Sequence, residues 1–276
     1  MTEHRSLNSG SLLGHYGRPN GRRPQQAEKL TDMTAPMPDS TWPLSRTAAS
    51  AAVEAIGWRY LLGNLATSVP VGSLTQASAA AAAAIAAGPG IDAHLRVDLR
   101  PDRVELSLQT RLIGRVTAAD VALAQQISAA LGAVGLITGG ATTAQGSRPV
   151  QMLELAIDAM DIVAIRPFWM AVLGYSGDPA DDGPTGALLD ASGQLPTMWF
   201  QQMDAPRPQR TRIHFDITGA HDESEARVEA ALAAGGKLLS DSAARSFWVL
   251  ADVEGNEVCV CSWPDRDERD GLGTAQ

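Results

Sequence analysis

The sequence is poor in cysteine and has no long apolar run, and each shortage excludes a class of protein. Its 276 residues include two cysteines, Cys259 and Cys261. If these lie on one strand, they point the same way and suit no ordinary disulfide, which favours a reducing, cytoplasmic location. No apolar run approaches the roughly 18 residues of a membrane span, and the N-terminus lacks the pattern of a secretory signal.

Basic residues are also scarce. The chain holds 22 Lys and Arg against 31 Asp and Glu, which gives a net charge of −9 and a pI near 5.0. Contacts to phosphate need a basic surface, so this balance argues against a nucleic-acid partner. We therefore expect a soluble cytoplasmic protein that has neither a nucleic acid nor a membrane as its partner.

Composition divides the chain into two globular segments. Residues 1–40 are polar and lack hydrophobic periodicity, which predicts a disordered tail, and residues 265–276 form a polar tail. Residues 138–149 are rich in Gly, Ser and Thr and have the composition of a linker. The globular segments are then residues 41–137 and 150–264, a division that 276 residues allow.

The first segment contains a predicted β-hairpin whose turn is Pro101-Asp102. Apolar and polar residues alternate along both strands, which is typical of a sheet with one buried face. The apolar residues of the two strands match in one register, and that register is therefore favoured. Its pairs are Leu95 with Leu108, Val97 with Leu106, and Leu99 with Val104.

The same segment carries two candidate functional residues, His94 and Asp120. In the predicted register His94 lies opposite Gln109 on the polar face of the hairpin, with Arg111 diagonally adjacent. The pattern Thr117-x-x-Asp120 is a capping box that opens a helix ending near residue 131. The alternative is that His94 only faces solvent and that Asp120 only caps the helix.

The second segment repeats itself. Residues 154–174 predict a strand and a helix that ends at a glycine, and residues 214–235 predict the same order. The returns match as well, because the Asp-x-x-Gly pattern of residues 190–193 recurs at residues 252–255. The sequence therefore predicts an α+β domain made of two copies of a strand, a helix and two or three antiparallel strands, with a cleft between the copies.

The second segment contains four motifs in order: Phe168-Trp169, Leu173-Gly174-Tyr175, Arg212-Ile-His214-Phe-Asp216 and Asp252-Val-Glu-Gly255-Asn256-Glu257. Through them the segment resembles the vicinal-oxygen-chelate superfamily, which includes glyoxalases and bleomycin-resistance proteins. The resemblance covers residues 150–264. It implies a small-molecule cleft and, in the metal-dependent members, a metal held by the first and last strands of each module.

The resemblance also implies which four side chains would hold a metal. Cys259 stands where the family pattern has a glutamate. Gln201 is chosen on the first module's last strand because it shares a face with Trp199, and Gln202 is the alternative. Carboxylate, imidazole and thiolate all bind zinc, so a divalent metal such as zinc is one interpretation. The other is a metal-free cleft in which His214 makes hydrogen bonds. The candidate ligands are Glu154, Gln201, His214 and Cys259.

Four further residues are candidates for binding a small molecule. Tryptophan on an amphipathic face either stacks on a flat ligand or fills the core. A guanidinium group beside an imidazole holds an anionic or carbonyl-bearing ligand. The candidates are Arg111, Trp169, Trp199 and Arg212.

Three short motifs of the first segment stand in order: Ala93-His94-Leu95, Thr110-Arg111 and Thr117-Ala-Ala-Asp120. They match His-His-Pro, Thr-His and Thr-x-x-Asp of the pterin-4a-carbinolamine dehydratases, which the segment resembles over about residues 44–132. Two histidines of the family pattern are replaced here, by Ala93 and Arg111. The resemblance implies a lyase that acts on a pterin-like carbinolamine through His94 and Asp120.

The replacements matter because of the chemistry. Dehydration of a carbinolamine needs one proton delivered to the leaving hydroxyl and another removed from the ring nitrogen. Imidazole performs both transfers near neutral pH. One imidazole beside the permanently charged Arg111 does not fill both roles, so we expect dehydratase turnover to be weak or absent.

The sequence thus predicts a two-domain α+β protein, a dehydratase-like module followed by a glyoxalase-like module, that forms a homodimer. Three functions remain open. The first is a lyase acting on a pterin. The second is a non-catalytic small-molecule binding or resistance protein. The third is a metal-dependent glyoxalase-like enzyme.

Overall fold

The computed structural model describes residues 42–139, 150–206, 213 and 215–265. The predicted N-terminal tail, most of the predicted linker and nearly all of the C-terminal tail lie outside these residues. None of the described helices is long and apolar enough to cross a membrane. Residues 42–139 are called the N-terminal part below, and residues 150–265 the C-terminal part.

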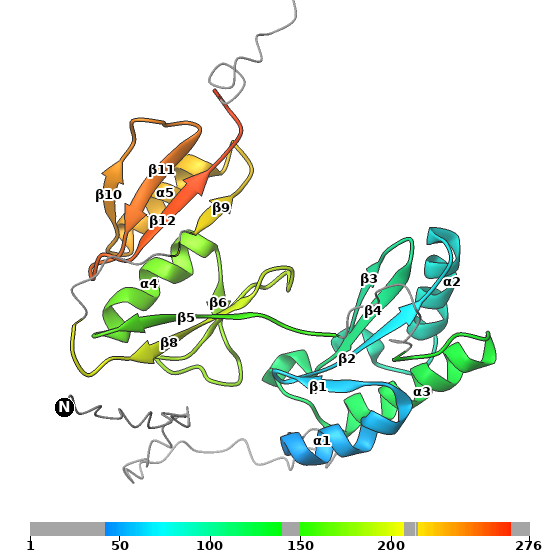
Figure 1. Ribbon diagram of the computed structural model, residues 1–276. Helices are drawn as coiled ribbons and strands as arrows, with labels where there is room; N and C mark the ends of the chain where they lie inside the picture. The colour runs from blue at the N-terminus through cyan, green and yellow to red at the C-terminus, as the bar shows by residue number, and fades with distance from the viewer. Residues whose placement is uncertain (1–41, 140–149, 207–212, 214, 266–276) are drawn as a thin grey trace, which may run out of the picture. The chain divides into compact units, whose positions relative to one another are not determined.

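The N-terminal part is a four-stranded antiparallel sheet with helices on one face (Figure 1). The strand order is β1-β2-β4-β3. Along β4, buried and half-buried residues alternate, as expected of a sheet covered on one side. The elements are α1 (Arg46–Val53), η2 (Glu54–Ile56), β1 (Arg59–Leu61), β2 (Asn64–Pro70), α2 (Leu74–Ile85), η3 (Ile91–Ala93), β3 (Leu95–Leu99), β4 (Arg103–Leu108), η4 (Arg111–Ile113) and α3 (Ala118–Ala133).

The predicted hairpin forms in the predicted register. All three apolar pairs, from Leu95 with Leu108 to Leu99 with Val104, are present between β3 and β4. The predicted capping box is also present, and helix α3 begins directly after Thr117. Local sequence patterns therefore determine both elements that flank His94.

The N-terminal part extends two residues beyond the predicted boundary at residue 137. The Thr138 hydroxyl donates to the Ile56 carbonyl at 2.6 Å, and the Gly139 amide donates to the Thr67 hydroxyl at 2.8 Å. A Cβ atom on Gly57 would collide with the Thr138 carbonyl, so this close approach needs a glycine there. Composition placed Thr138 in the linker because composition does not show that the distant Ile56 carbonyl accepts a hydrogen bond from the Thr138 hydroxyl.

The C-terminal part contains two copies of one module. The sheets have the strand orders β5-β8-β7-β6 and β9-β12-β11-β10, and in each the first strand pairs in parallel with the last (Figure 1). The predicted tandem repeat is therefore confirmed. The elements are β5 (Glu154–Ala159), α4 (Ile162–Leu173), β6 (Ser176–Gly177), β7 (Leu188–Leu189), β8 (Thr197–Gln202), β9 (Asp216–Thr218), α5 (Ser224–Ala233), β10 (Lys237–Ser240), β11 (Phe247–Ala251) and β12 (Glu257–Cys261).

Helix α4 of the first module is held by three side chains of the second. In its middle, the buried Trp169 indole N–H donates to the Asp252 carboxylate at 2.9 Å. At its N-terminal end, the Glu254 carboxylate accepts from the amides of Met160 and Asp161 at 2.9 and 2.6 Å.

The C-terminal end of α4 is bound by a positively charged side chain, whereas a carboxylate binds its N-terminal end. The Arg227 guanidinium donates to the carbonyls of Val172 and Leu173 at 3.4 and 3.3 Å. A negative charge near the N-terminus of a helix and a positive charge near its C-terminus both interact favourably with the helix dipole. The two modules also share one hydrophobic core, so these contacts fix α4 inside a joint structure.

The repeated Asp-x-x-Gly pattern builds the same loop in both modules. Asp190 accepts hydrogen bonds from the Ser192 hydroxyl and from three backbone amides that follow it. Burial alone would raise the pKa of Asp190, but these donors outweigh it and lower the pKa to about 2. Asp252 accepts in the same way from the amides of Glu254 and Asn256.

We predict that Asp252→Ala destabilises the C-terminal part by about 3 kcal/mol, because the substitution leaves the buried Trp169 N–H and the loop amides without an acceptor. Urea unfolding followed by tryptophan fluorescence measures the change. Asp241→Ala, at an exposed carboxylate, is the control and should be nearly neutral. Equal effects of the two substitutions would contradict the importance of the buried contact.

Candidate functional site

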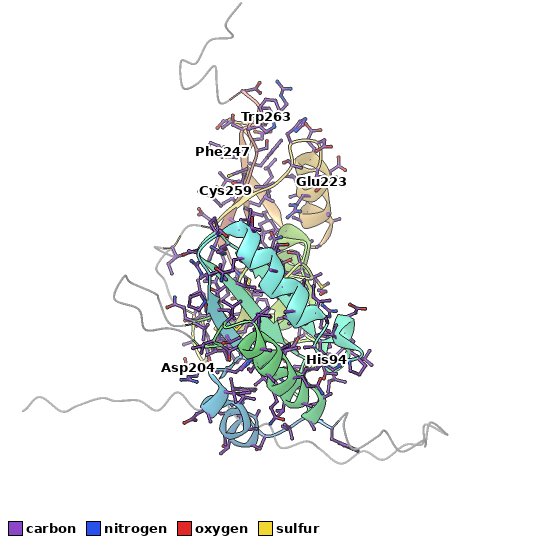
Figure 2. The ribbon with its side chains drawn as sticks, turned by 90° about the vertical axis from the view of Figure 1, so that its right-hand side faces the viewer. His94, Asp204, Glu223, Phe247, Cys259 and Trp263 are labelled. Carbon is purple, nitrogen blue, oxygen red and sulfur yellow. The ribbon has the colours of Figure 1, made fainter. Side chains whose placement is uncertain are left out.

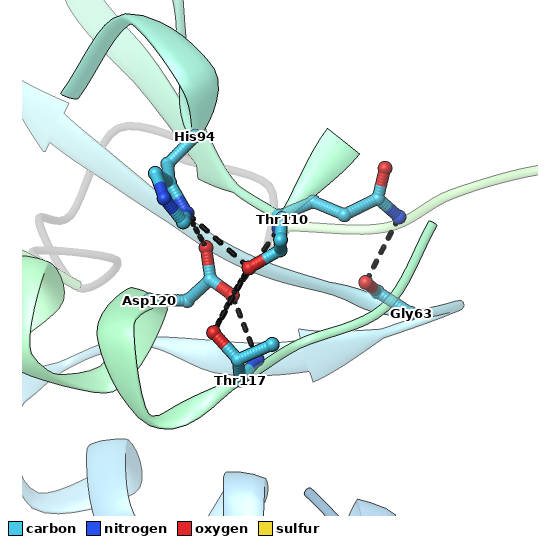
Figure 3. Close-up of polar contacts among 6 residues, drawn as sticks. Gly63, His94, Thr110, Thr117 and Asp120 are labelled. Carbon is cyan, nitrogen blue, oxygen red and sulfur yellow. Dashed lines mark hydrogen bonds and ion pairs between the residues drawn. The ribbon is translucent and has the colours of Figure 1, made fainter. Parts of the chain in front are cut away.

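The structure brings His94 and Asp120 together although they are 26 residues apart in the sequence. The His94 Nδ1 atom lies 2.7 Å from Asp120 Oδ1. The Asp120 side chain is fully buried, whereas 15% of the His94 side chain is exposed. The pair therefore has a buried carboxylate behind an imidazole that solvent reaches. Figure 3 shows the contact between the two side chains.

Asp120 is surrounded by hydrogen-bond donors. Its Oδ2 atom accepts from the Thr117 amide at 2.7 Å, from the Thr110 hydroxyl at 2.8 Å and from the Thr110 amide at 3.2 Å. The Thr117 hydroxyl lies 3.1 Å from the same oxygen. One carboxylate therefore closes the cap of α3, fixes the end of the hairpin and orients the imidazole (Figure 3).

The position of His94 corrects the sequence analysis, which placed its side chain on the polar face of the hairpin. Strand β3 begins only at Leu95, and His94 ends the turn η3 with φ −125° and ψ −49°. The two-residue alternation of a strand does not extend to such a backbone, so the ring reaches the start of α3. The backbone pairing is as predicted, since the Gln109 amide donates to the His94 carbonyl.

Arg111 does not lie beside His94 as expected, and Thr110 contacts the His94–Asp120 pair although it was not expected there. Arg111 lies in η4 and is exposed. Within the described part of the chain, no hydrogen bond or ion pair joins it to His94. Thr110 was not proposed as a site residue, yet its hydroxyl contacts Asp120 and lies 3.3 Å from His94 Nδ1. The signal that was available is its match to the Thr-His pair of the dehydratase pattern.

This arrangement fixes which nitrogen of His94 is available for chemistry. An ionised carboxylate only accepts hydrogen bonds, so Nδ1 carries the proton when it binds Asp120. The lone pair then lies on Nε2, the ring nitrogen that makes no hydrogen bond to the described residues. A histidine oriented in this way is built to take up or release one proton.

The second candidate site lies on the faces of the C-terminal sheets that are turned away from the helices, called here the outer face. In the first module, Ile157, Met198 and Phe200 belong to the core. The alternate residues therefore point outward, and they include Trp199 and Gln201. The outward residues of the two paired strands are Glu154, Ala156, Asp158, Thr197, Trp199 and Gln201.

The second module has the same construction. Trp248, Leu250 and Val258 pack into the core, so Cys259 and its pairing partners Asp216 and Val249 lie on the outer face. Cys259 and Phe247 are marked on these strands in Figure 2. Asp216 is exposed, and Phe247 is half-buried. The outer face thus combines carboxylates with aromatic rings in both modules.

The described residues do not fit the expected metal centre. Glu154 pairs with Thr197, whereas Gln201 pairs with Asp158, four residues further along the strand and about 13 Å away. In the metal-free protein, burial, with the Asp216 charge as the next cause, raises the pKa of Cys259 to about 12.

The other described side chains do not form a metal site either. Among the residues that the structure describes, no group of three or more His, Cys, Asp or Glu side chains is arranged to hold a metal ion. Two predicted residues, His214 and Arg212, lie outside these residues. We therefore assign no chemistry to a metal here.

The two tryptophans proposed for ligand stacking have different surroundings. Trp169 has no exposed surface and bonds to Asp252, so it belongs to the core and a ligand does not reach it. Trp199 is half-buried on the outer face. Trp199 therefore stays a candidate for stacking, and Trp169 does not.

A family comparison identifies the C-terminal part. Residues 154–261 match the family model described as a glyoxalase-like domain. These residues thus form a glyoxalase-like domain of the vicinal-oxygen-chelate superfamily. The match does not extend to residues 42–139, and the dehydratase resemblance of that part is not shown. No curated protein matches the chain significantly.

Solved structures of other proteins are similar to 40–44% of this chain. A glyoxalase/bleomycin resistance protein/dioxygenase family enzyme from Burkholderia phytofirmans PsJN is 20% identical, with 40% of this chain and 95% of that chain covered and a TM-score of 0.33. The fosfomycin resistance protein FosX from Mesorhizobium loti is 9% identical, with 44% and 97% covered and a TM-score of 0.34.

We predict that Cys259 in the folded protein reacts with iodoacetamide at pH 8 roughly 10³-fold more slowly than an unfolded thiol, because the thiolate is the nucleophile and little of it is present. A Cys261→Ser variant makes Cys259 the single reporter, and mass spectrometry follows its modification. The same variant unfolded in guanidinium is the control. Native and unfolded rates that agree would contradict the buried, protonated thiol.

Proposed function

We propose that the glyoxalase-like domain binds a cationic, partly aromatic small molecule on its outer face and uses no resident metal. The observation that carries this proposal is that Trp199 shares its outward strand face with Glu154 and Asp158 of the neighbouring strand. Aromatic rings attract flat ligands and cations through their π faces. A binding or resistance protein of this kind was the second of the three functions left open by the sequence.

The charge of the domain supports a cationic ligand. Residues 150–265 contain 18 Asp and Glu against 7 Lys and Arg, a net charge of −11. The N-terminal part, with 6 acids and 7 bases, has a net charge of +1. The negative charge of the protein therefore belongs to the domain with the proposed ligand face. A field of one sign raises the local concentration of ligands of the opposite sign.

The test uses two dyes of opposite charge, acriflavine as the cation and fluorescein as the anion. Isothermal titration should show binding of acriflavine that weakens with added salt, and no comparable binding of fluorescein. Trp199→Ala should weaken acriflavine binding at least tenfold.

The matched control for this variant is Trp42→Ala, which removes a tryptophan that is 65% exposed and belongs to the N-terminal part. It should leave the affinity unchanged. Thermal unfolding verifies that both variants are folded. Equal binding of the two dyes, or equal losses in the two variants, would refute the proposal.

A second candidate function rests on the His94–Asp120 pair. A buried carboxylate that orients an imidazole 2.7 Å away supports proton transfer, the chemistry of the dehydratases that this part resembles. The imidazole would remove or deliver one proton of a pterin-like carbinolamine, and Thr110 would help to hold the carboxylate. With Ala93 and Arg111 in place of two histidines, slow turnover is expected.

The assay is conversion of a tetrahydropterin 4a-carbinolamine, measured as the rate above the uncatalysed reaction. His94→Gln should abolish the slow turnover, while His221→Gln, at an exposed histidine of the other part, should not. Ala93→His combined with Arg111→His should raise the rate about 10²-fold by restoring a second acid–base group. A rate that survives His94→Gln would exclude this site.

A further inference from the structure

Trp263 is 61% exposed, although the backbone on both sides of it is held in place. The Ser262 amide donates to the Ser246 carbonyl at 2.9 Å, and the Ser246 hydroxyl donates to the Pro264 carbonyl at 2.9 Å. Ser246, Ser262 and Pro264 are all buried. The exposure of the indole is therefore a feature of the fold and does not come from fraying at the end of a strand.

The Trp263 ring contacts the imidazole of His221, an exposed residue between β9 and α5. The two ring centroids lie 5.0 Å apart, and the ring planes are tilted by 59°. The turn that carries the imidazole is fixed as well, because the Ala220 carbonyl accepts from the Glu223 amide at 3.1 Å and from the Ser224 hydroxyl at 3.0 Å. Two aromatic rings thus meet at an angle on the surface, on backbone that is already ordered.

The charges around this pair of rings are mostly negative. Asp222 and Glu223, which directly follow the imidazole, are exposed, and Figure 2 labels Glu223 beside helix α5. Residues 215–265 contain 10 Asp and Glu against 3 Lys and Arg, a net charge of −7. One of the three bases, Arg245, is neutralised by Asp265 through hydrogen bonds of 3.0 and 2.7 Å. The carboxylates also outweigh the partial positive charge at the start of α5.

We propose that the Trp263–His221 pair binds a compact organic cation of the alkylammonium class. The face of an aromatic ring attracts a cation, and two rings set at an angle both contact a tetrahedral ammonium group, whereas a planar ligand stacks on one ring. Asp222 and Glu223 add attraction of the right sign. A neutral sugar also stacks on tryptophan, but the negative charge does not favour it. This site lies beyond the ends of β9 and β12 and does not rest on the proposed function of Trp199.

The test is ¹⁹F NMR of the full chain labelled with 5-fluorotryptophan, in which each of the six tryptophans gives its own signal. Trp263→Phe identifies the signal of Trp263. Tetramethylammonium chloride is added in exchange for sodium chloride, so that the ionic strength stays constant. We expect a saturable shift of the Trp263 signal with a dissociation constant in the millimolar range. The signal of Trp42, which is 65% exposed in the N-terminal part, should not move.

Substitutions around the pair separate the contributions of ring and charge. His221→Ala removes one ring and should weaken binding at least threefold, whereas His221→Phe keeps a ring and should preserve it. Asp222→Asn combined with Glu223→Gln should weaken binding about threefold. Glu229→Gln, at an exposed carboxylate further along α5, is the matched control and should leave the affinity unchanged. Circular dichroism verifies that each variant is folded.

Three outcomes would overturn the proposal. The first is a Trp263 signal that does not move with tetramethylammonium. The second is a shift that glucose produces and tetramethylammonium does not, which would assign the pair to a sugar. The third is an affinity that His221→Ala leaves unchanged. The signal of Trp199 reports on the outer face in the same spectra, so failure of this proposal is distinguished from failure of the proposed function.

Discussion

The buried hydrogen bond between Trp169 and Asp252 is the contact on which the C-terminal domain depends. It joins a helix of the first module to a loop of the second inside a shared core. Glu254 and Arg227 then bind the two ends of the same helix with charges of the favourable sign. With α4 held in this way, each module keeps its helix on one side of its sheet and leaves the other side uncovered by helices.

A second buried carboxylate, Asp120, has the same kind of role in the N-terminal part. Its oxygens accept from Thr110, Thr117 and His94, which come from three separate segments. Burying a carboxylate costs free energy unless hydrogen-bond donors surround it. The buried Asp120 therefore ties together the three segments that supply its donors. The orientation of His94 is thus a consequence of how the helix cap is built, and one carboxylate serves both purposes.

Patterns within the sequence predicted the elements that depend on local alternation. The hairpin register and the tandem modules followed from the spacing of apolar residues and from the repeated Asp-x-x-Gly loops. The side of the hairpin reached by His94 did not follow, because a 3₁₀ turn interrupts the alternation one residue before the strand. The buried place of Thr138 was missed for a related reason, since its acceptor belongs to a turn 82 residues away.

The candidate site of the second domain was harder to predict than its fold. The family pattern assigned Glu154 to the first strand, and the face shared with Trp199 assigned Gln201 to the last strand of the same module, but the register separates the two by four residues. Likewise, the sequence shows that Cys259 is present and does not show that burial keeps its thiol protonated. Ligand chemistry depends on such distances and surroundings, whereas the fold depends on the apolar pattern that positions the strands.

Native mass spectrometry of the full chain, purified without chelators, decides whether the glyoxalase-like domain works without a resident metal. We expect a mass equal to the polypeptide, alone or with an organic cation that dissociates on activation. A stoichiometric metal ion, retained under native conditions and lost on unfolding, would overturn the proposal of a metal-free domain that binds an organic cation.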